Sequence, residues 1–209
     1  MRRLYLALLT VALLSCGSNP KPQATVAKSV SFEKKGATFT LKLEYPAIEG
    51  VPPALNKQLA ETALIHLEQV EDDPIPFEEY AKNLAEESAG QQWAFESIMT
   101  VAHQSPSILT TLCKTYTNTG AAHPNVFNYY EVYDMATGKR LELTDLLEDG
   151  KLPALRGLAK ITEEYPNEPE IGLLKESLVF RPDPDARMVL DTEIPYAQLK
   201  GILKSKYLP

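Results

Sequence analysis

Polar and apolar residues alternate from Thr38 to Tyr45, and this period of two predicts a strand with one buried and one solvent-facing side. The turn sequence Lys34-Lys35-Gly36 precedes it, so we expect Val30–Glu33 and Ala37–Tyr45 to form a hairpin. After the strand predicted at Val126–Asp134, we expect the chain to form a hairpin turn in which Gly138 occupies a position that requires a positive φ. Three later segments are rich in β-branched and aromatic residues and predict further strands: Trp93–His103, Ile108–Tyr116 and Val126–Asp134.

Apolar residues recur at helical spacing in three other segments. They predict helices from Pro52-Pro53 to Val70, from Phe77 to about Ser88, and from Lys151 to Glu164. The C-terminal part is expected to add four short elements: a helical turn capped by Thr144, strands Leu178–Phe180 and Met188–Leu190 around the turn Pro182-Asp183-Pro184, and a closing helix from Ile194 to Leu203.

This order of elements predicts an α+β fold, in which an antiparallel sheet carries helices packed on one face. Alternation along the strand Val126–Asp134 places Tyr129 and Tyr133 on one face of the sheet and Tyr130 on the other. At least one of these two faces is expected to be wet.

The N-terminus predicts a secretory signal peptide. Arg2 and Arg3 precede an apolar run, Leu4–Leu14, that is much shorter than the ~20 residues of a membrane-spanning helix. The sequence Leu13-Leu14-Ser15-Cys16 resembles a bacterial lipobox, in which the cysteine is acylated and the chain is cut just before it. We therefore expect residues 1–15 to be a lipoprotein signal peptide, 16–28 a flexible tether, and 29–209 the folded domain. The alternative is an ordinary cleaved signal with a chance cysteine.

Lipid on Cys16 implies a protein of the cell envelope with the membrane as a partner. Gly17 is not the aspartate that tends to retain lipoproteins at the inner membrane of diderms, which favours the outer membrane, facing the periplasm. Cys113 is then the only free thiol, and we expect it to be a buried small apolar residue.

The net charge of the chain limits the classes of molecule that it is expected to bind. The formal net charge is −7, and it becomes −9 when Arg2 and Arg3 leave with the signal peptide, which contains no acidic residue. An acidic chain argues against nucleic acid and against anionic lipid headgroups. It is compatible with a basic protein partner.

The segment Thr115–Asn125 resembles the signature of the bacterial extracytoplasmic family DUF3298, in which a strand ending in tyrosine runs into a glycine-rich loop with a histidine. Ala121 stands where that family usually has its second glycine. Thr137-Gly138-Lys139 and Leu141–Leu147 are similar to the segments that follow in the family, and Tyr45–Asn56 resembles the companion module DUF4163. Members occur with peptidoglycan deacetylase domains, with an anti-sigma factor that responds to lysozyme, and as stand-alone lipoproteins, so the resemblance implies a recognition or scaffold unit.

Candidate binding residues lie in this loop and in the strands beside it. Aromatic rings can cover the faces of sugars, and amides can bond their hydroxyl groups. The candidates are Tyr116, Asn118, Gly120, His123, Asn125, Tyr130 and Asp134.

Two interpretations of His123 remain open. Its ring can tie down the loop by hydrogen bonds to the backbone or to Asp134, or it can be an acid–base group paired with Asp134 or Asp145. His66, His103 and His123 are the only histidines, and no two have the i, i+4 spacing of metal ligands. We expect no metal and no cofactor.

These observations favour a lipid-anchored, non-enzymatic envelope domain that recognises peptidoglycan or a basic envelope-active protein such as lysozyme. The first alternative is a cell-wall hydrolase or deacetylase-associated enzyme that uses His123 with a nearby carboxylate. The second is a purely structural partner of another envelope protein.

Overall fold

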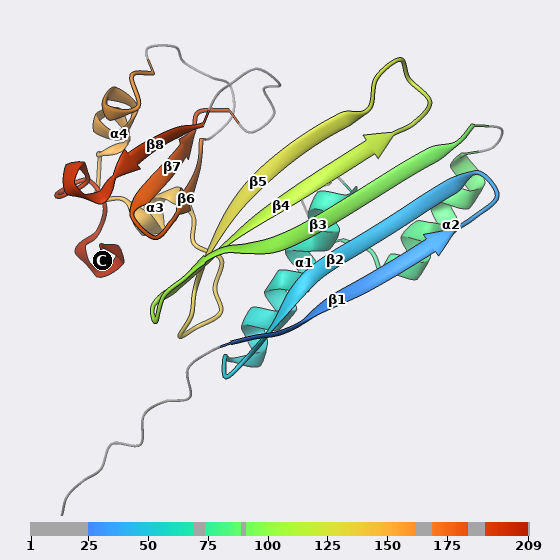
Figure 1. Ribbon diagram of the computed structural model, residues 1–209, viewed down its shortest axis with the longest axis horizontal. Coiled ribbons are helices and arrows are strands. Elements are labelled where there is room, and N and C mark those ends of the chain that lie inside the picture. Colours follow the sequence, from blue (N-terminus) through green and yellow to red (C-terminus); the bar gives the residue numbers. More distant parts are fainter. Residues whose placement is uncertain (1–24, 69–73, 89–90, 162–168, 184–190, 209) are drawn as a thin grey trace, which may run out of the picture.

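A five-stranded sheet with two helices on one face is followed by a three-stranded sheet in the computed structural model (Figure 1). The structure describes residues 25–68, 74–88, 91–161, 169–183 and 191–208. The signal peptide and Cys16 therefore lie outside the described residues. The large sheet consists, in order across it, of β1 (Thr25–Lys35), β2 (Phe39–Glu49), β3 (Trp93–Gln104), β4 (Ile108–Asn118) and β5 (Asn125–Asp134).

The α+β class is confirmed, but one strand pair departs from the antiparallel prediction. Strands β2 and β3 pair in parallel, whereas the other neighbours in this sheet pair antiparallel. The two strands are joined by α1 (Pro53–Glu68) and α2 (Phe77–Glu87). A crossover of this length returns the chain to the end of the sheet from which β2 started, so β3 runs in the same direction as β2.

Helices α1 and α2 cover one face of the large sheet, behind the strands in the view of Figure 1. The Asn56 side chain exchanges two hydrogen bonds of 2.8 and 2.9 Å with the backbone of Ile48, which fixes the start of α1 to the end of β2. The Ser97 hydroxyl donates to the Ala63 carbonyl at 2.9 Å and ties the middle of α1 to β3. Apolar residues of the sheet and of α1 form the first core, among them Leu41, Leu43, Leu55, Leu59, Phe95, Met99 and Leu109.

The beginning of the folded domain differs from the predicted boundary. Strand β1 begins at Thr25, so residues Thr25–Lys28, which the composition assigns to the tether, lie opposite residues Ala47–Glu49 of β2. The predicted hairpin is confirmed and is longer than expected. No helix in the described part of the chain is both long enough and apolar enough to cross a membrane.

The C-terminal part forms a second core around a small sheet. This sheet contains β6 (Glu170–Leu173), β7 (Ser177–Arg181) and β8 (Thr192–Pro195), all antiparallel. Strand β6 has no counterpart among the predicted elements, and the predicted strand Met188–Leu190 lies outside the described residues. The short helices α3 (Leu143–Leu146) and α4 (Leu152–Leu158) and two 3₁₀ turns, Tyr196–Gln198 and Ser205–Tyr207, complete this unit.

One predicted helix of this unit is shorter than expected, and another is not formed. Helix α4 ends at Leu158 because Lys160 adopts a positive φ of 58°, which is incompatible with helix continuation, and residues 162–164 of the prediction lie outside the described part. The predicted helix Ile194–Leu203 is wrong: Ile194 and Pro195 belong to β8, and only Tyr196–Gln198 form a 3₁₀ turn. Ile194 lies opposite Leu178 in β7, and the ladder holds the chain extended there.

Candidate functional site

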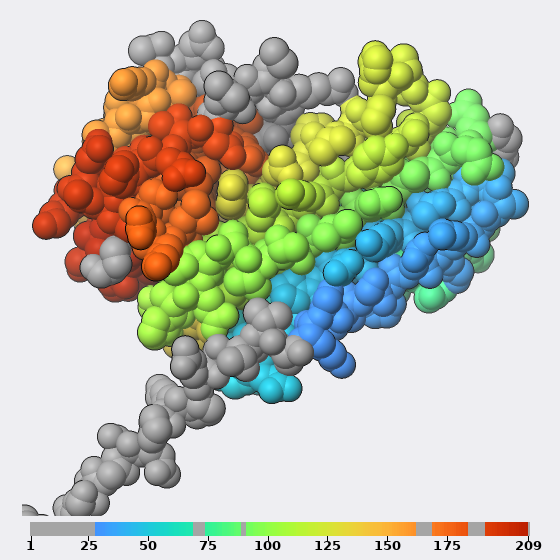
Figure 2. Space-filling view, in the orientation of Figure 1, coloured from blue at the N-terminus to red at the C-terminus, as the bar shows by residue number. Residues whose placement is uncertain are grey.

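The face of the large sheet opposite α1 and α2 carries no described helix, and it fills the middle of Figure 2. We call it the open face. Its side chains alternate with those that point to the helices, because neighbouring residues of a strand point to opposite sides. Its members from β2 to β5 are Thr40, Lys42, Glu44, Ala94, Glu96, Ile98, Thr100, Leu112, Lys114, Tyr116, Asn118, Val126 and Asn128.

Strand register arranges these side chains in rows that cross the sheet. One row runs from Lys42 through Glu96 and Tyr116 to Val126. The next row runs from Glu44 through Ile98 and Lys114 to Asn128. Charged, aromatic, amide and apolar groups therefore lie beside one another on the same surface.

The small sheet covers one end of the open face. The Thr110 hydroxyl donates to the Leu173 carbonyl of β6 at 2.6 Å. Tyr130 lies at this margin, with the Arg181 guanidinium carbon 5.3 Å from its ring centroid. Tyr130 is therefore half-buried under the small sheet, at the edge of the uncovered part of the face.

The loop between β4 and β5 holds three of the predicted site residues close together. The Asn118 side chain accepts a hydrogen bond from the Gly120 backbone amide at 3.0 Å, and its amide group donates to the Tyr116 hydroxyl at 3.5 Å. Gly120 has a φ of 82°, as the glycine at this position suggests. His123 is exposed in the same loop, and its side chain has no hydrogen bond or ion pair with the described residues.

Asn125 and Asp134 do not join this group. Asn125 lies opposite Thr117 on the helix-facing side of the sheet. Asp134 ends β5, about 30 Å along the strand from Asn125 at the usual rise per residue. There its carboxylate accepts hydrogen bonds of 2.9 Å from the backbone amides of Ala136 and Thr137 and closes the turn at Gly138, whose φ is 76°.

The suggested pairing of His123 with Asp134 or Asp145 is therefore wrong, both as a loop tie and as an acid–base pair. Asp145 binds Lys139 Nζ at 2.8 Å and the Glu142 backbone amide at 3.0 Å. Asp134 is the last residue of β5 and Asp145 pairs with Lys139 just after it, so both carboxylates lie at the opposite end of β5 from the His123 loop. A fully extended strand separates its ends by too great a distance for a hydrogen bond.

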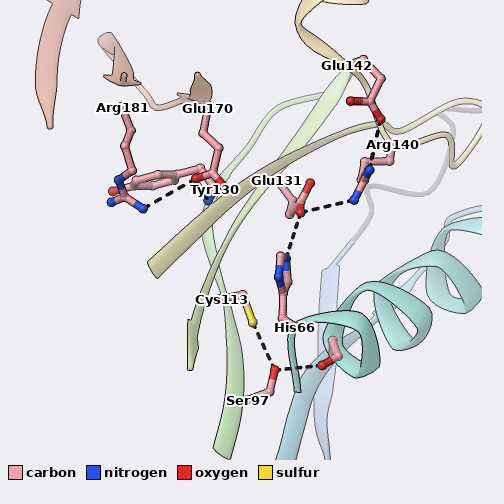
Figure 3. Close-up of polar contacts among 10 residues, drawn as sticks. His66, Ser97, Cys113, Tyr130, Glu131, Arg140, Glu142, Glu170 and Arg181 are labelled. Atoms are coloured by element: carbon pink, nitrogen blue, oxygen red, sulfur yellow. Dashed lines mark hydrogen bonds and ion pairs between the residues drawn. The ribbon is translucent and has the colours of Figure 1, made fainter. Parts of the chain in front are cut away.

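A polar seam that the sequence did not reveal joins the two sheets (Figure 3). The Glu170 carboxylate accepts a hydrogen bond of 3.1 Å from the Tyr130 backbone amide and lies 3.6 Å from Arg181 Nη1. Arg181 also forms a bidentate pair with Asp191, at 2.7 and 2.8 Å. Burial is the main reason that the pKa of Glu170 is raised to about 8. The nearby charge of Glu131 also raises this pKa, whereas the Tyr130 backbone amide and Arg181 lower it.

A second polar cluster lies on the helix-facing side of β5 (Figure 3). His66 Nε2 is 2.9 Å from a Glu131 carboxylate oxygen, and the His66 ring stacks on Tyr129 with centroids 4.3 Å apart. Arg140 lies 3.5 Å from Glu131 and 3.2 Å from Glu142. Glu131 lies between Tyr129 and Tyr133 on the same, helix-facing side of β5. A carboxylate buried in this position requires a hydrogen-bond or ion-pair partner. That pattern was the available signal for this cluster.

Cys113 is buried on the helix-facing side, 3.2 Å from the Ser97 hydroxyl. Burial raises the pKa of its thiol to about 12, so the thiolate form is strongly disfavoured. The prediction that Cys113 is a buried residue is confirmed. Among the described residues, no group of three or more His, Cys, Asp or Glu side chains is placed to hold a metal ion.

Solved structures of bacterial proteins have a similar fold. A DUF3298 family protein from Pseudomonas aeruginosa shares it with a TM-score of 0.68 at 19% identity, covering 87% of this chain and 96% of that chain. A DUF3298 family member from Bacteroides fragilis gives a TM-score of 0.60 at 16% identity, covering 85% and 93%. The chain therefore has the fold of DUF3298 proteins, which confirms the resemblance at the level of the fold.

A family model described as deacetylase PdaC matches residues 32–126. This stretch runs from the middle of β1 to the start of β5 and includes both α1 and α2. It contains most of the open face and excludes the small sheet. A search of curated proteins finds no match.

Proposed function

We propose that this protein is a lipid-anchored, non-enzymatic domain of the bacterial cell envelope, related to DUF3298 proteins, that recognises peptidoglycan through its open face. One observation carries the proposal: on a sheet surface that no described helix covers, Tyr116 lies between Asn118, its same-face neighbour in β4, and Asn128, its diagonal neighbour in β5. A half-buried tyrosine ring offers a rigid apolar surface to a sugar. The two amides offer both donors and acceptors to hydroxyl, acetamido and peptide groups.

The charge of the open face favours peptidoglycan over a basic protein. Lys42 and Lys114 alternate with Glu44 and Glu96, so positive and negative groups are balanced across β2, β3 and β4. A surface specialised for a basic protein would be acidic at its centre, because complementary potentials guide such partners together. Peptidoglycan carries hydroxyls, amides and charges of both signs, which this mixture can bind.

The separation of His123 from Asp134 and Asp145 supports a binding role over hydrolysis. A histidine general base normally relies on a second group that orients its ring and stabilises the charged form. The carboxylates considered for this purpose lie at the other end of β5. The lipobox ending at Cys16 supports the anchor, and an outer-membrane position facing the periplasm follows from Gly17.

The proposal is tested by co-sedimentation with purified peptidoglycan sacculi, using the protein without residues 1–16 so that all of β1 is kept. We expect the wild type to sediment with sacculi and Tyr116→Ala to bind about tenfold more weakly, a loss of about 1.4 kcal/mol that is comparable with the contribution of one aromatic contact. Asn128→Ala should also weaken binding, whereas Asn83→Ala, on the exposed side of α2, should not.

Equal sedimentation of Tyr116→Ala and the wild type would refute the open face as the binding surface. Capture of lysozyme without any binding to sacculi would favour the basic-protein alternative. Release of soluble muropeptides by the wild type, abolished in His123→Ala at unchanged melting temperature, would instead establish an enzyme.

A further inference from the structure

Glu96 and Lys114 are neighbours on the open face and carry opposite charges. Glu96 in β3 lies directly opposite Tyr116 in β4, and Lys114 lies directly opposite Ile98. The two charged residues are therefore diagonal neighbours in adjacent strands. Diagonal positions of this kind are about 7–8 Å apart.

Neither charge has an ion-pair partner among the described residues, although the charges beside them do. On β2, Lys42 Nζ lies 3.4 Å from Glu44, and Glu44 also accepts a hydrogen bond of 2.8 Å from Ser29. Lys42 lies directly opposite Glu96 in the sheet, but its ammonium group is paired with Glu44 and not with Glu96. Charges on the β1–β2 side of the open face are paired within the fold, and those on the β3–β4 side are available to a ligand.

The side chains around this pair define what such a ligand must offer. Tyr116 lies next to Lys114 along β4 and opposite Glu96, so an aromatic ring lies beside both charges. Lys114 is exposed, and Glu96 and Tyr116 are partly exposed. A ligand that satisfies all three carries a carboxylate, an ammonium group within about 8 Å of it, and an apolar or sugar face between them.

Resting on the proposed function, we propose that the open face recognises an un-cross-linked stem peptide of peptidoglycan, with its free carboxylate on Lys114 and the free ammonium group of its diamino acid on Glu96. Cross-linking converts that ammonium group into a neutral amide. A cross-linked peptide leaves Glu96 without a cation, so the domain distinguishes open from cross-linked wall. Tyr116 supports the sugar or the peptide stem between the two charged contacts.

The test compares three synthetic muropeptides by isothermal titration with the mature protein: one with the free amine and carboxylate, one with the amine acetylated, and one with the carboxylate amidated. We expect the free form to bind at least tenfold more tightly than either blocked form. Glu96→Gln should abolish the preference over the acetylated form while keeping the affinity for that form. Lys114→Met should abolish the preference over the amidated form. The matched controls are Glu86→Gln and Lys82→Met, both exposed on α2.

Equal affinity of the wild type for all three muropeptides would overturn the inference. A Glu96→Gln variant that weakens the free and the acetylated form by the same factor would also overturn it, because Glu96 would then not contact the ammonium group. If sacculi still bind in a Tyr116-dependent manner in these cases, the proposed function stands and only this inference fails. If neither sacculi nor any muropeptide binds, both fail.

Discussion

The Glu170 carboxylate accepts a hydrogen bond from the backbone amide of Tyr130, with 3.1 Å between Oε2 and the nitrogen. Tyr130 belongs to β5, the last strand of the large sheet, and Glu170 begins β6 of the small sheet. This contact and the Arg181 side chain above the Tyr130 ring join the two sheets at one place. The protonation state of the Glu170 carboxyl group therefore contributes to the stability of this junction, beside the Thr110 hydrogen bond to Leu173.

Stability should fall as the pH rises from about 4.5 to about 8. Burial raises the pKa of Glu170 from 4.5 to about 8, so the folded state binds a proton in this interval that the unfolded state has released. The stabilising contribution of the protonated Glu170 carboxyl group is complete below pH 4.5. It is lost as the pH rises through the pKa that Glu170 has in the folded state. We expect a loss of about 1–3 kcal/mol between pH 5 and 8, measured by urea unfolding.

Glu170→Gln should remove most of this pH dependence, because a glutamine resembles the protonated acid and can still accept the Tyr130 hydrogen bond. Glu193→Gln, on the neighbouring strand β8, is the control and should keep the wild-type profile. A wild type whose stability rises from pH 5 to 8, with Glu170→Gln following the same curve, would contradict the assignment.

His66→Ala should destabilise the protein, whereas His123→Ala should leave its stability almost unchanged. The first removes a largely buried ring that bonds Glu131 at 2.9 Å and stacks on Tyr129, and it should lower the free energy of unfolding by about 1–3 kcal/mol. His123→Ala removes an exposed ring and should change the free energy of unfolding by less than about 0.5 kcal/mol. Thermal unfolding of both variants checks this, and sacculus binding by His66→Ala should be unchanged because His66 lies on the helix-facing side.

Gly138→Ala should destabilise the protein more than Gly150→Ala. Both glycines have a positive φ, 76° and 69°, so an alanine is strained at either position. A Cβ at Gly138 would lie 2.5 Å from the Leu55 backbone nitrogen, whereas a Cβ at Gly150 meets nothing within 4 Å. We expect about 1 kcal/mol for Gly150→Ala and at least about 2 kcal/mol more for Gly138→Ala. Similar melting temperatures for the two variants would show that α1 does not approach the turn this closely.

Cys16→Ser should release the protein from the membrane fraction or leave its signal peptide uncleaved. Acylation requires a thiol, and a serine at this position cannot receive the lipid. The measurement is incorporation of a radioactive fatty acid together with membrane fractionation of wild type and variant. Cys113→Ser is the control and should keep the label, because Cys113 is buried in the folded domain. A wild type that takes up no label would contradict lipid anchoring.

Local patterns predicted the elements well where one side of a strand or helix is buried. The alternation from Thr38 to Tyr45 located β2, and the alternation of Tyr129, Tyr130 and Tyr133 assigned their faces correctly. The parallel pairing of β2 with β3 was not predictable from alternation, which is the same in parallel and antiparallel strands. The relative direction of β2 and β3 depends on the long connection through α1 and α2 that joins them.

The candidate site was predicted less well than the fold, for two physical reasons. The loop residues Asn118 and Gly120 were found because their contact is local in sequence. The seam between Tyr130 and Glu170 joins residues far apart in the chain, and no spacing rule reveals such a contact. The supposed pair of His123 and Asp134 is instructive, because the strand predicted between them already implied a separation of about 30 Å.

The parallel contact between β2 and β3 also has a kinetic consequence. Strands β1 and β2 form one local hairpin, and β3, β4 and β5 form another local meander, so each unit can assemble through short loop closures. The two units meet only after the chain of α1 and α2 has been closed, which is the slow, non-local step. Lys42 and Glu96 lie opposite each other across this junction, so a molecule lying along their row would bridge the two separately assembled units.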